Sequence, residues 1–229
     1  MIVTTKQKAL QRQAGYTLVE LSISVAIISV LIVTGLYGVP RILDTNKIST
    51  TVQQLSIANA NYSKLFSQTG SGSFAYTPAY STATRLDLAG MGVFPDEAIV
   101  RSGTTNTPYA IKHPFNGFVY SKSVANPIAG FLAVDEGYIV KLEAVPPKNC
   151  FALASAFAPT AVMITVDSST TAATLGPITT AAATTETATG TANAVVVKSA
   201  GQSLNTTSLV TQCTTNPTVV KSIYLWFAY

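Results

Sequence analysis

The sequence predicts an α+β fold in which a long N-terminal helix packs on an antiparallel sheet, with one disulfide in the same domain. Three observations lead to this prediction. An apolar run without charge covers residues 21–40, and short strand-like runs separated by turn residues begin near residue 118. Two cysteines lie in the C-terminal half of the chain.

The composition bounds the class of protein. With 229 residues and 48% hydrophobic content, the chain is long enough for one globular domain and an additional segment. Charged residues make up 10%, against roughly 25% in ordinary soluble proteins. Three of the 14 basic residues precede Tyr16, so a chain that starts there carries eleven basic and ten acidic residues, a formal charge of +1. This balance argues against a nucleic-acid partner.

Residues 21–40 predict a membrane-spanning helix. No charge lies between Glu20 and Arg41, and twenty helical residues extend about 30 Å. Basic residues precede the run, so the N-terminus is expected in the cytoplasm and the chain after Arg41 outside. A secretory signal peptide or a simple membrane anchor is the alternative. Two features argue against a signal peptide. No A-x-A-like cleavage site follows the apolar run, and Glu20 lies at its start. A carboxylate at this position costs free energy to bury in a membrane, so we expect an amine as its partner.

The segment QAGYTLVELSISVAIISVLIV resembles the prepilin signature of type IV pilins. That signature is a glycine, an aromatic or apolar residue, and a glutamate four residues further on, at the start of an unbroken hydrophobic helix. Here these residues are Gly15, Tyr16 and Glu20. The resemblance implies that residues 1–15 are a leader and that a prepilin peptidase cuts between Gly15 and Tyr16. It also implies that the same peptidase methylates the new amino group of Tyr16.

The resemblance also implies how copies of the chain would assemble. Glu20 of one subunit would accept the Tyr16 amine of a neighbour, so that the two charges neutralise each other only in the correct axial register. The expected product is a helical homo-oligomeric filament, built by an inner-membrane platform with a cytoplasmic ATPase. The subunit would reside in the inner membrane before assembly and in an extracellular pilus afterwards. No cofactor is implied.

Past Arg41 the helix is expected to continue as an amphipathic segment. Residues 41–69 carry apolar side chains at multiples of three and four, a pattern that buries one face of a helix on the head. These residues are Ile48, Val52, Leu55, Tyr62 and Phe66. Gly70 is a plausible C-terminal cap, so the helix from Tyr16 would extend about 80 Å, with residues 16–40 as a hydrophobic stalk.

Gly35, Gly38 and Pro40 interrupt this helix, and a proline in a helix interior costs about 3 kcal/mol. We therefore expect a kink or a locally unwound stretch. Two interpretations stay open. The residues near 33–40 could melt when subunits stack and let the fibre stretch, or the interruption could be an ordinary kink where the helix leaves the membrane.

Residues 70–229 predict a globular α/β head. Residues 70–94 are expected to form a long surface connection, and the run Val219–Phe227 a buried strand that closes the sheet. The stretch Ser168–Thr191 is rich in Thr and Ala, and we prefer an exposed loop to an adhesive surface. The other expected strands are Phe118–Lys122, Phe131–Val134, Tyr138–Glu143, Val162–Val166 and Ala194–Val197, with a short helix at Asn149–Phe157.

Cys150 and Cys213 both follow the membrane segment, where an oxidising compartment favours a disulfide, and one bridge between them would stabilise the fold by about 4 kcal/mol. Two distant thiols and a single histidine make no zinc spacing, so no metal site is expected. The size of the head and the wide cysteine separation are similar to the type IVb pilins, in which the region between the cysteines would be the exposed, variable face.

Catalytic groups are sparse. His113 is the single histidine, so no Ser/His/Asp set can be assembled and a surface or structural role is favoured. The acidic pairs Asp96–Glu97 and Asp135–Glu136 are more typical of solvated turns, because adjacent residues of a strand point to opposite faces. We therefore expect no enzyme, and the resemblance to type IV pilins implies a structural subunit, for which the major pilin is the first hypothesis. The alternatives are a minor pilin or type II secretion pseudopilin and, from another class, a membrane-anchored periplasmic enzyme or binding protein.

Overall fold

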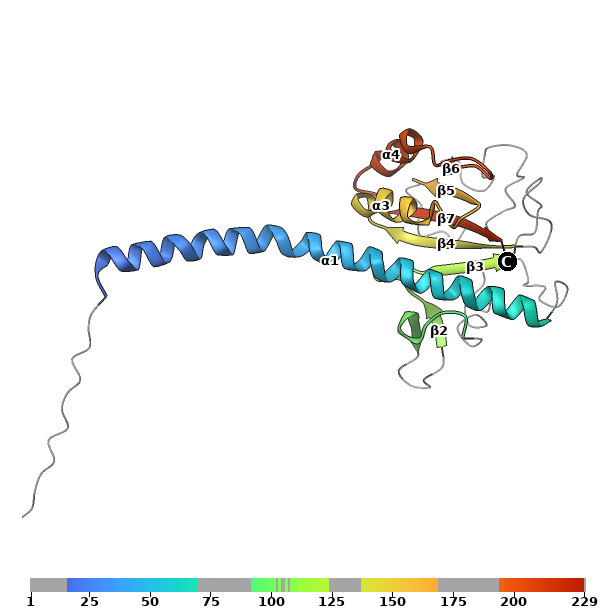
Figure 1. Ribbon diagram of the computed structural model, residues 1–229, viewed down its shortest axis with the longest axis horizontal. Helices are drawn as coiled ribbons and strands as arrows, with labels where there is room; N and C mark the ends of the chain where they lie inside the picture. The colour runs from blue at the N-terminus through green and yellow to red at the C-terminus, as the bar shows by residue number, and fades with distance from the viewer. Residues whose placement is uncertain are drawn as a thin grey trace, which may run out of the picture. The chain divides into compact units, whose positions relative to one another are not determined.

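A computed structural model describes residues 16–69, 92–101, 103, 106, 108–123, 137–168 and 194–228 (Figure 1). It contains a long helix and an antiparallel sheet, which confirms the predicted fold class. The chain divides into one unit that ends at Leu43 and one that begins at Asp44. The elements are α1 (Leu18–Thr69), η1 (Asp96–Ala98), β1 (Ile99–Arg101), β2 (Pro108–Ile111), β3 (Val119–Ser123), β4 (Gly137–Val145), α3 (Pro147–Phe157), β5 (Met163–Asp167), β6 (Ala194–Lys198), α4 (Thr206–Thr214) and β7 (Lys221–Ala228).

Helix α1 begins where a local capping signal places its first turn. The Glu20 N–H donates to Thr17 Oγ1 at 3.2 Å, and the Leu21 N–H donates to the Thr17 carbonyl oxygen at 3.1 Å. Thr17 and Glu20 have the Thr-x-x-Glu spacing of a capping box, and an acidic side chain in the first turn is favourable to the helix dipole. The helix therefore starts at Leu18, close to the predicted cleavage position.

The helix α1 is continuous through Gly35, Gly38 and Pro40 in this single chain. Of the two interruptions expected there, the locally unwound stretch is therefore wrong for the isolated subunit, whereas a kink is compatible with continuous helix and stays a prediction. A proline removes one backbone donor, and one missing hydrogen bond does not by itself end a helix of 52 residues. Melting of this stretch on assembly stays a prediction, since it concerns packed copies of the chain.

Five strands form one antiparallel sheet in the order β3-β4-β7-β5-β6, and β1 pairs with β2 in a separate two-stranded sheet. Strand β7 was expected to close the sheet, and this was wrong because β7 lies at its centre. Tyr138 of β4 is opposite Phe227, and Met163 of β5 is opposite Trp226. Residues 221–227 are all buried, as expected for a strand covered on both faces.

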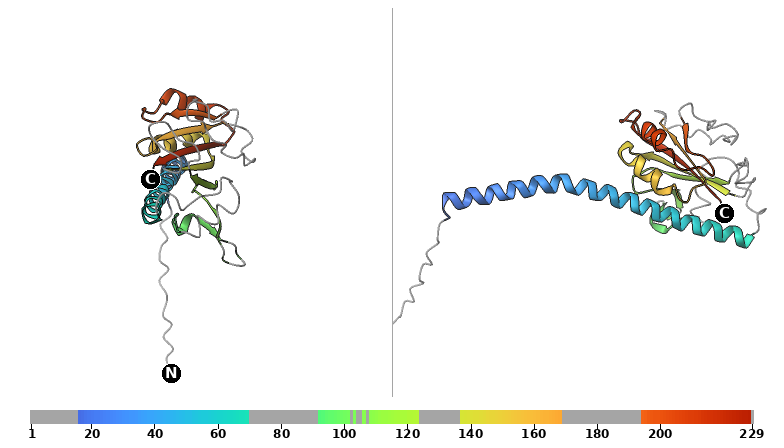
Figure 2. Two further views of the ribbon diagram at one scale, coloured as in Figure 1. Left: turned by 90° about the vertical axis from the view of Figure 1, so that its right-hand side faces the viewer. Right: turned by 45° about the horizontal axis from the view of Figure 1, so that its top comes forward.

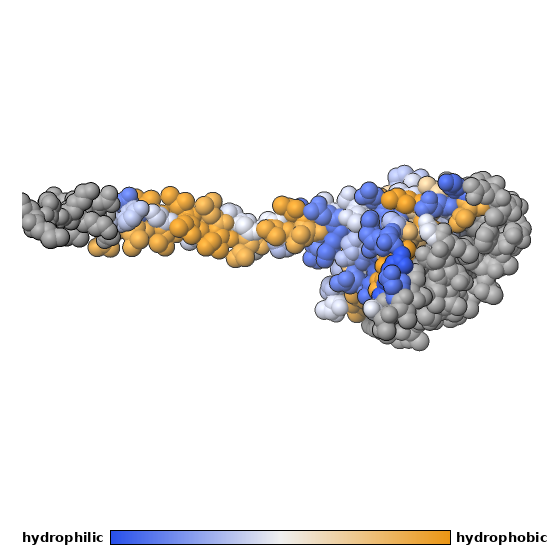
Figure 3. Space-filling model, turned by 90° about the horizontal axis from the view of Figure 1, so that it is seen from below, coloured by the Kyte–Doolittle hydropathy of each residue, from blue (hydrophilic) through white to orange (hydrophobic). Residues whose placement is uncertain are grey.

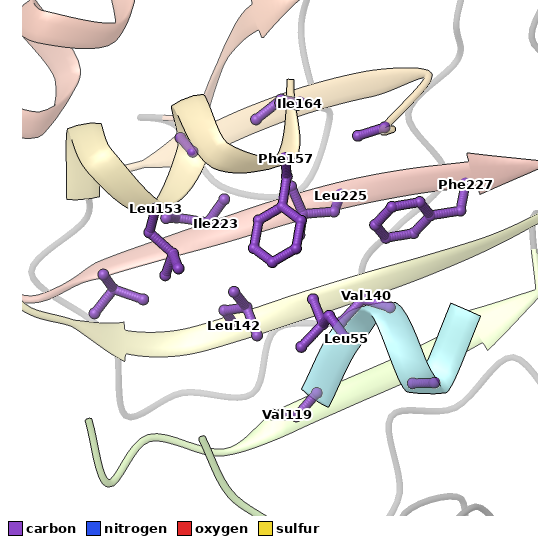
Figure 4. Packing of buried hydrophobic residues seen from close by; sticks show 14 of the residues in the cluster. Leu55, Val119, Val140, Leu142, Leu153, Phe157, Ile164, Ile223, Leu225 and Phe227 are labelled. Atoms are coloured by element: carbon purple, nitrogen blue, oxygen red, sulfur yellow. The ribbon is translucent and has the colours of Figure 1, made fainter. Parts of the chain in front are cut away.

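Three helices lie on one face of this sheet and bury its core (Figure 4). Leu55 of α1 lies near Val119 and Val140 of the β3–β4 edge, while α3 contacts β7 and α4 contacts β5 and β6. Tyr62 of α1 stacks on Tyr138 of β4 with 4.0 Å between ring centroids. The amphipathic stripe expected in α1 therefore faces the sheet. The side chain of Phe66 lies outside the described residues.

Part of the expected surface connection is core. Residues 70–91 lie outside the described part of the chain, but Val93 and Phe94 are 0% and 2% exposed. The Asn61 amide donates to the Gly92 and Val93 carbonyl oxygens, and the Phe94 ring meets the Tyr62 ring edge-on. The prediction of surface residues up to 94 was therefore wrong at its end, because α1 supplies partners for this backbone.

The other expected strands and the helix of the head are present within a few residues of their predicted bounds. The run Phe131–Val134, the acidic pair Asp135–Glu136 and residues 169–191 lie outside the described residues. Helix α4 was not predicted. It is rich in threonine, a weak helix former, and depends on Asn205, whose side chain caps the Ser208 N–H at 3.0 Å.

Candidate functional site

The first part of α1 exposes apolar side chains along its length (Figure 3). Leu18 is 87% exposed and Leu31 is 64% exposed in the single chain. A continuous apolar surface of this kind is unfavourable in water, where it marks a site of contact with a membrane or a protein partner. Within the described residues, this helix is long and apolar enough to cross a membrane.

The predicted processing residues lie at the start of this helix. Tyr16 is 80% exposed and precedes the first turn, and the Glu20 side chain is exposed in that turn. Gly15 lies outside the described residues. A carboxylate at the start of an uncharged helix can accept an ammonium group, and within the described residues the single chain supplies none to Glu20. The pairing of Glu20 with Tyr16 therefore stays a prediction.

The disulfide joins Cys150 of α3 to Cys213 of α4, with 5.6 Å between the Cα atoms. Both cysteines are buried, at 0% and 2% exposure. The predicted pairing is confirmed. The sequence did not supply its geometry, since Cys213 reaches α3 only because the unpredicted helix α4 packs against it.

A surface ion pair joins α1 to α3 within the unit that begins at Asp44. Lys148 Nζ donates to Asp44 Oδ2 at 2.6 Å, and this hydrogen bond lowers the pKa of the Asp44 carboxyl. The N-cap of α3 is Pro146, which makes no side-chain capping bond. Asp44 thus places a negative charge beside the first turn of α3, where the helix dipole favours it. No sequence pattern indicated this contact, because 104 residues separate the two partners.

His113 is a structural residue of the head. It is 2% exposed, its Nε2 lies 2.7 Å from the Glu143 carbonyl oxygen, and its Nδ1 lies 3.3 Å from the Phe115 amide nitrogen. A carbonyl only accepts and an amide N–H only donates, so the neutral imidazole with its proton on Nε2 satisfies both. Burial lowers the pKa of His113 to about 4. This agrees with the structural alternative expected from the sequence.

Gly117 lies at the same turn and permits this close approach. A Cβ atom at this position would lie 1.7 Å from the Glu143 carbonyl oxygen and 2.4 Å from His113 Nε2. Glu143 belongs to β4 beside an irregularity in its pairing with β7, next to Ala144, whose φ is 58°. The turn at Gly117 and the irregular part of β4 beside Glu143 therefore pack closely through their backbone atoms.

A buried charged cluster on the other face of the sheet was missed from the sequence. Lys141 Nζ lies 3.5 Å from Glu143 Oε1, and the Tyr120 hydroxyl donates to Glu143 Oε2 at 3.0 Å. Lys141 also lies over the Tyr120 and Tyr224 rings. The sequence signal that could have found this cluster is the alternation of side chains along β4, which places residues 141 and 143 on the same face of the strand. The cluster satisfies its own charges and provides a structural contact between β3, β4 and β7.

Nothing in the described part of the chain forms a metal-binding group of three or more His, Cys, Asp or Glu side chains. Asp96, from one of the acidic pairs expected in turns, is exposed in η1 and forms an ion pair with Arg101. The candidate functional site among the described residues is therefore the N-terminal helix with its exposed apolar surface.

Comparisons with known proteins also identify the N-terminal segment as a recognised motif. Residues 10–36 match the prokaryotic N-terminal methylation motif, and residues 41–200 match the family described as PilS N terminal. Among solved structures, the type IVb pilin from Salmonella typhi aligns with 77% of this chain and 97% of its own, at 9% identity and a TM-score of 0.47. TcpA, a type IV pilin from Vibrio cholerae El Tor biotype, aligns with 80% and 99% of the two chains, at 18% identity and a TM-score of 0.48. A comparison with curated proteins finds no match.

The methylation motif at the head of an apolar helix, followed by an antiparallel sheet domain with one disulfide, defines the class of type IV pilins. The chain belongs to the PilS N terminal family, whose model covers most of the sequence. Both structural TM-scores are below 0.5, so the assignment rests on the two sequence matches. Pilins are structural subunits that assemble into filaments, anchored in the membrane first and then part of an extracellular pilus.

Proposed function

We propose that this chain is the major structural subunit of a type IV pilus. One observation carries the proposal: the methylation motif of residues 10–36 opens a helix whose apolar side chains are exposed from Leu18 onward. An abundant subunit that packs through this helix would cover that surface along the whole fibre. Residues 16–40 would form the filament core, and residues 70–229 would form the head.

Processing creates the group that assembly needs. A prepilin peptidase cuts between Gly15 and Tyr16 and methylates the new amine, which keeps its positive charge as a secondary ammonium. In the membrane, Glu20 of a neighbouring copy accepts this ammonium. Two groups that are each costly to bury neutralise each other only when the copies are in register. An inner-membrane platform and a cytoplasmic ATPase supply the work of extraction, and local melting near Gly35, Gly38 and Pro40 gives the packed fibre its extensibility.

The intact mass of the chain from purified fibres tests the processing. We expect loss of residues 1–15, the addition of one methyl group, and a mass lower by two hydrogens for the Cys150–Cys213 bridge. A functional fibre whose subunit keeps its first fifteen residues would refute the proposal. Replacement of Gly15 by a bulky residue is expected to leave uncut precursor in the membrane.

The role of Glu20 is tested with Glu20→Ala beside Glu20→Asp as a matched control. We expect Glu20→Ala to be cut as efficiently as the natural chain but to give a severalfold lower yield of sheared fibres, because the neighbour's ammonium is left unpaired. Glu20→Asp keeps the charge and is expected to retain part of the yield. Normal fibres from Glu20→Ala would contradict the charge pairing and leave a simple membrane anchor as the better description.

The abundance of the chain in sheared fibres separates a major subunit from the alternatives. A major pilin makes up most of the fibre mass, whereas a minor pilin or a secretion pseudopilin is present at a few copies or at none. A fibre that forms without this chain, or that contains it only in trace amounts, would contradict the assignment as major pilin.

A further inference from the structure

The turn that joins β2 to β3 has a fixed shape that the proposed function leaves unexplained. The Asn116 N–H donates to the His113 carbonyl oxygen at 2.9 Å, and the Phe115 N–H donates to His113 Nδ1 at 3.3 Å. The His113 ring is buried, and Gly117 leaves no space for a side chain beside the Glu143 carbonyl oxygen. The backbone of this turn is therefore held in place, and the fold sets the position of the Phe115 ring.

Two lysines pack on the aromatic rings of this turn. Lys47 Nζ of α1 lies 5.9 Å from the centre of the Phe115 ring, and Lys112 Nζ lies 5.2 Å from the centre of the Phe118 ring. We call these four residues the Lys–Phe surface. Lys47 is exposed, and the other three are half-buried. Among the described residues neither lysine forms an ion pair, so each ammonium group keeps hydrogen-bond donors for a further acceptor.

A third lysine and an aspartate lie on the α3 side of Lys47. The hydrogen bond from Lys148 is the main cause of the lowered pKa of the Asp44 carboxyl, and the charge of Lys47 contributes to it. Lys148 Nζ lies 2.6 Å from Asp44 Oδ2 and already neutralises this carboxylate, so Lys47 is left with its positive charge. Helix α3 and strand β2 lie on opposite sides of this part of α1 (Figure 2). Lysine side chains therefore flank the helix on both sides.

The acidic residues of η1 neutralise little of this charge. The Lys112 N–H donates to the Ala98 carbonyl oxygen at 2.8 Å, which places η1 beside the Lys–Phe surface. Asp96 of η1 is already paired with Arg101. Glu97 is exposed and carries one negative charge. Around this surface, the described residues thus leave two unpaired lysines and one glutamate, and the balance is positive.

The sequence places this surface close to the membrane. Arg41 is the first charged residue after the apolar run, and Lys47 follows it by six residues. Six residues of helix extend about 9 Å. The headgroup layer beyond the hydrocarbon is about 5–8 Å thick on each side, so the long side chain of Lys47 can reach its phosphates. Because Phe115 lies against Lys47, the turn that carries Lys112 lies at the same level of α1.

A lipid surface fits this combination of residues. Lysines beside phenylalanine rings are typical of protein surfaces that lie on membranes, where the ring contacts the headgroup boundary and the ammonium binds a phosphate. We propose that the Lys–Phe surface binds the phosphate groups of anionic phospholipids at the outer face of the inner membrane, with Lys47 and Lys112 as the binding residues. This contact holds the head on the membrane before assembly. It goes beyond the proposed function, because it rests on membrane anchoring alone and applies equally to a major and a minor subunit.

Acetylation of lysines on the full-length chain in lipid nanodiscs tests this contact. One disc contains phosphatidylcholine alone, and the other contains phosphatidylcholine and phosphatidylglycerol in equal amounts. An uncharged acetylating reagent reacts only with neutral amines, which a bound phosphate disfavours, and mass spectrometry gives the rate at each lysine. We expect Lys47 and Lys112 to react about fivefold more slowly in the phosphatidylglycerol disc, the factor expected for one lysine at an anionic surface. Lys64 lies 17 residues beyond Lys47 on α1, about 26 Å, and is the internal control whose rate stays unchanged.

Two variants show whether the two lysines act together. Lys112→Gln removes one charge from the surface, and we expect the protection of Lys47 by phosphatidylglycerol to fall at least twofold. Lys112→Arg keeps the charge and is the matched control, which is expected to retain the protection. The oxidised Cys150–Cys213 bridge shows that the head of each variant is folded. If Lys112→Gln does not fold, the comparison of the two discs with the natural chain still decides the proposal.

Four results would overturn the lipid contact. The first is equal rates for Lys47 and Lys112 in the two discs, and the second is the same protection of Lys47 in Lys112→Gln and Lys112→Arg. The third is equal protection by inorganic phosphate added to the phosphatidylcholine disc, which would indicate a site for the free anion. The fourth is protection that rises with the number of chains per disc at constant lipid, which would indicate a contact between copies. None of these measurements needs a fibre, so a failure of the proposed function is observed separately.

Discussion

The acid stability of the head can be predicted from His113. In the folded chain its pKa is lowered from 6.5 to about 4 because the ring is buried. Protonation would also place an N–H at Nδ1, opposite the Phe115 N–H that this atom accepts. As the pH falls below 6.5, the unfolded chain takes up a proton at this residue, whereas the folded chain does so only near pH 4. The stabilising contribution is therefore present at neutral pH and is lost as the pH falls through this window.

The size of the effect follows from the shift. A difference of this size between the folded and unfolded pKa values corresponds to about 3 kcal/mol in the free energy of unfolding between about pH 7 and about pH 4. His113→Gln is the informative variant, because an amide can still donate to the Glu143 carbonyl oxygen but does not titrate. We expect His113→Gln to be less stable than the natural chain at neutral pH and to lose less stability on acidification.

The assay is chemical denaturation of the full-length chain in detergent micelles at several pH values, followed by tryptophan fluorescence from Trp226 in β7. Other titrating groups are common to both proteins, so the difference between their unfolding free energies isolates His113. That difference should shrink by about 3 kcal/mol from about pH 7 to about pH 4. A difference that stays constant over this range would refute the assignment of a buried, neutral imidazole.

Three further perturbations have expected outcomes. Gly117→Ala should lower the free energy of unfolding by about 3 kcal/mol or more, since its Cβ meets a backbone carbonyl that cannot move aside, and a variant as stable as the natural chain in denaturant would contradict this. Cys150→Ser or Cys213→Ser should lower it by about 4 kcal/mol, and reduction of the natural chain should have the same effect as either variant in thermal denaturation. Asp44→Asn should lower it by less than about 1 kcal/mol, because its partner Lys148 is largely exposed, and this small loss should vanish at high salt.

The sequence by itself determined the elements whose signals are local. An uncharged apolar run followed by an apolar stripe defined α1, and the cap expected at Gly70 lies outside the described residues. Strand-like runs between turn residues located β3 to β7 within a few residues. The disulfide also followed from the sequence, because two cysteines on the same side of a membrane leave one pairing.

Only the tertiary structure decided what depends on contacts between distant segments. The central place of β7 is set by pairing with β4 and β5, and strand order has no local signature. Helix α4 is weak in propensity and is held by its cap at Asn205, by the disulfide and by packing. Val93 and Phe94 were assigned to the surface because the stretch that ends with them is rich in Gly, Ser, Thr, Ala and Tyr, whereas both are buried against α1.

The same distinction applies to the candidate site. Tyr16 and Glu20 could be proposed as site residues from a short motif, because the proposed cleavage and charge pairing require particular residues at fixed spacing. The contact between Lys148 and Asp44 could not, because 104 residues separate the two in the chain and only the packed fold brings them together. Local sequence therefore specified the N-terminal segment, and the packing of three helices on one sheet specified the face that the head presents.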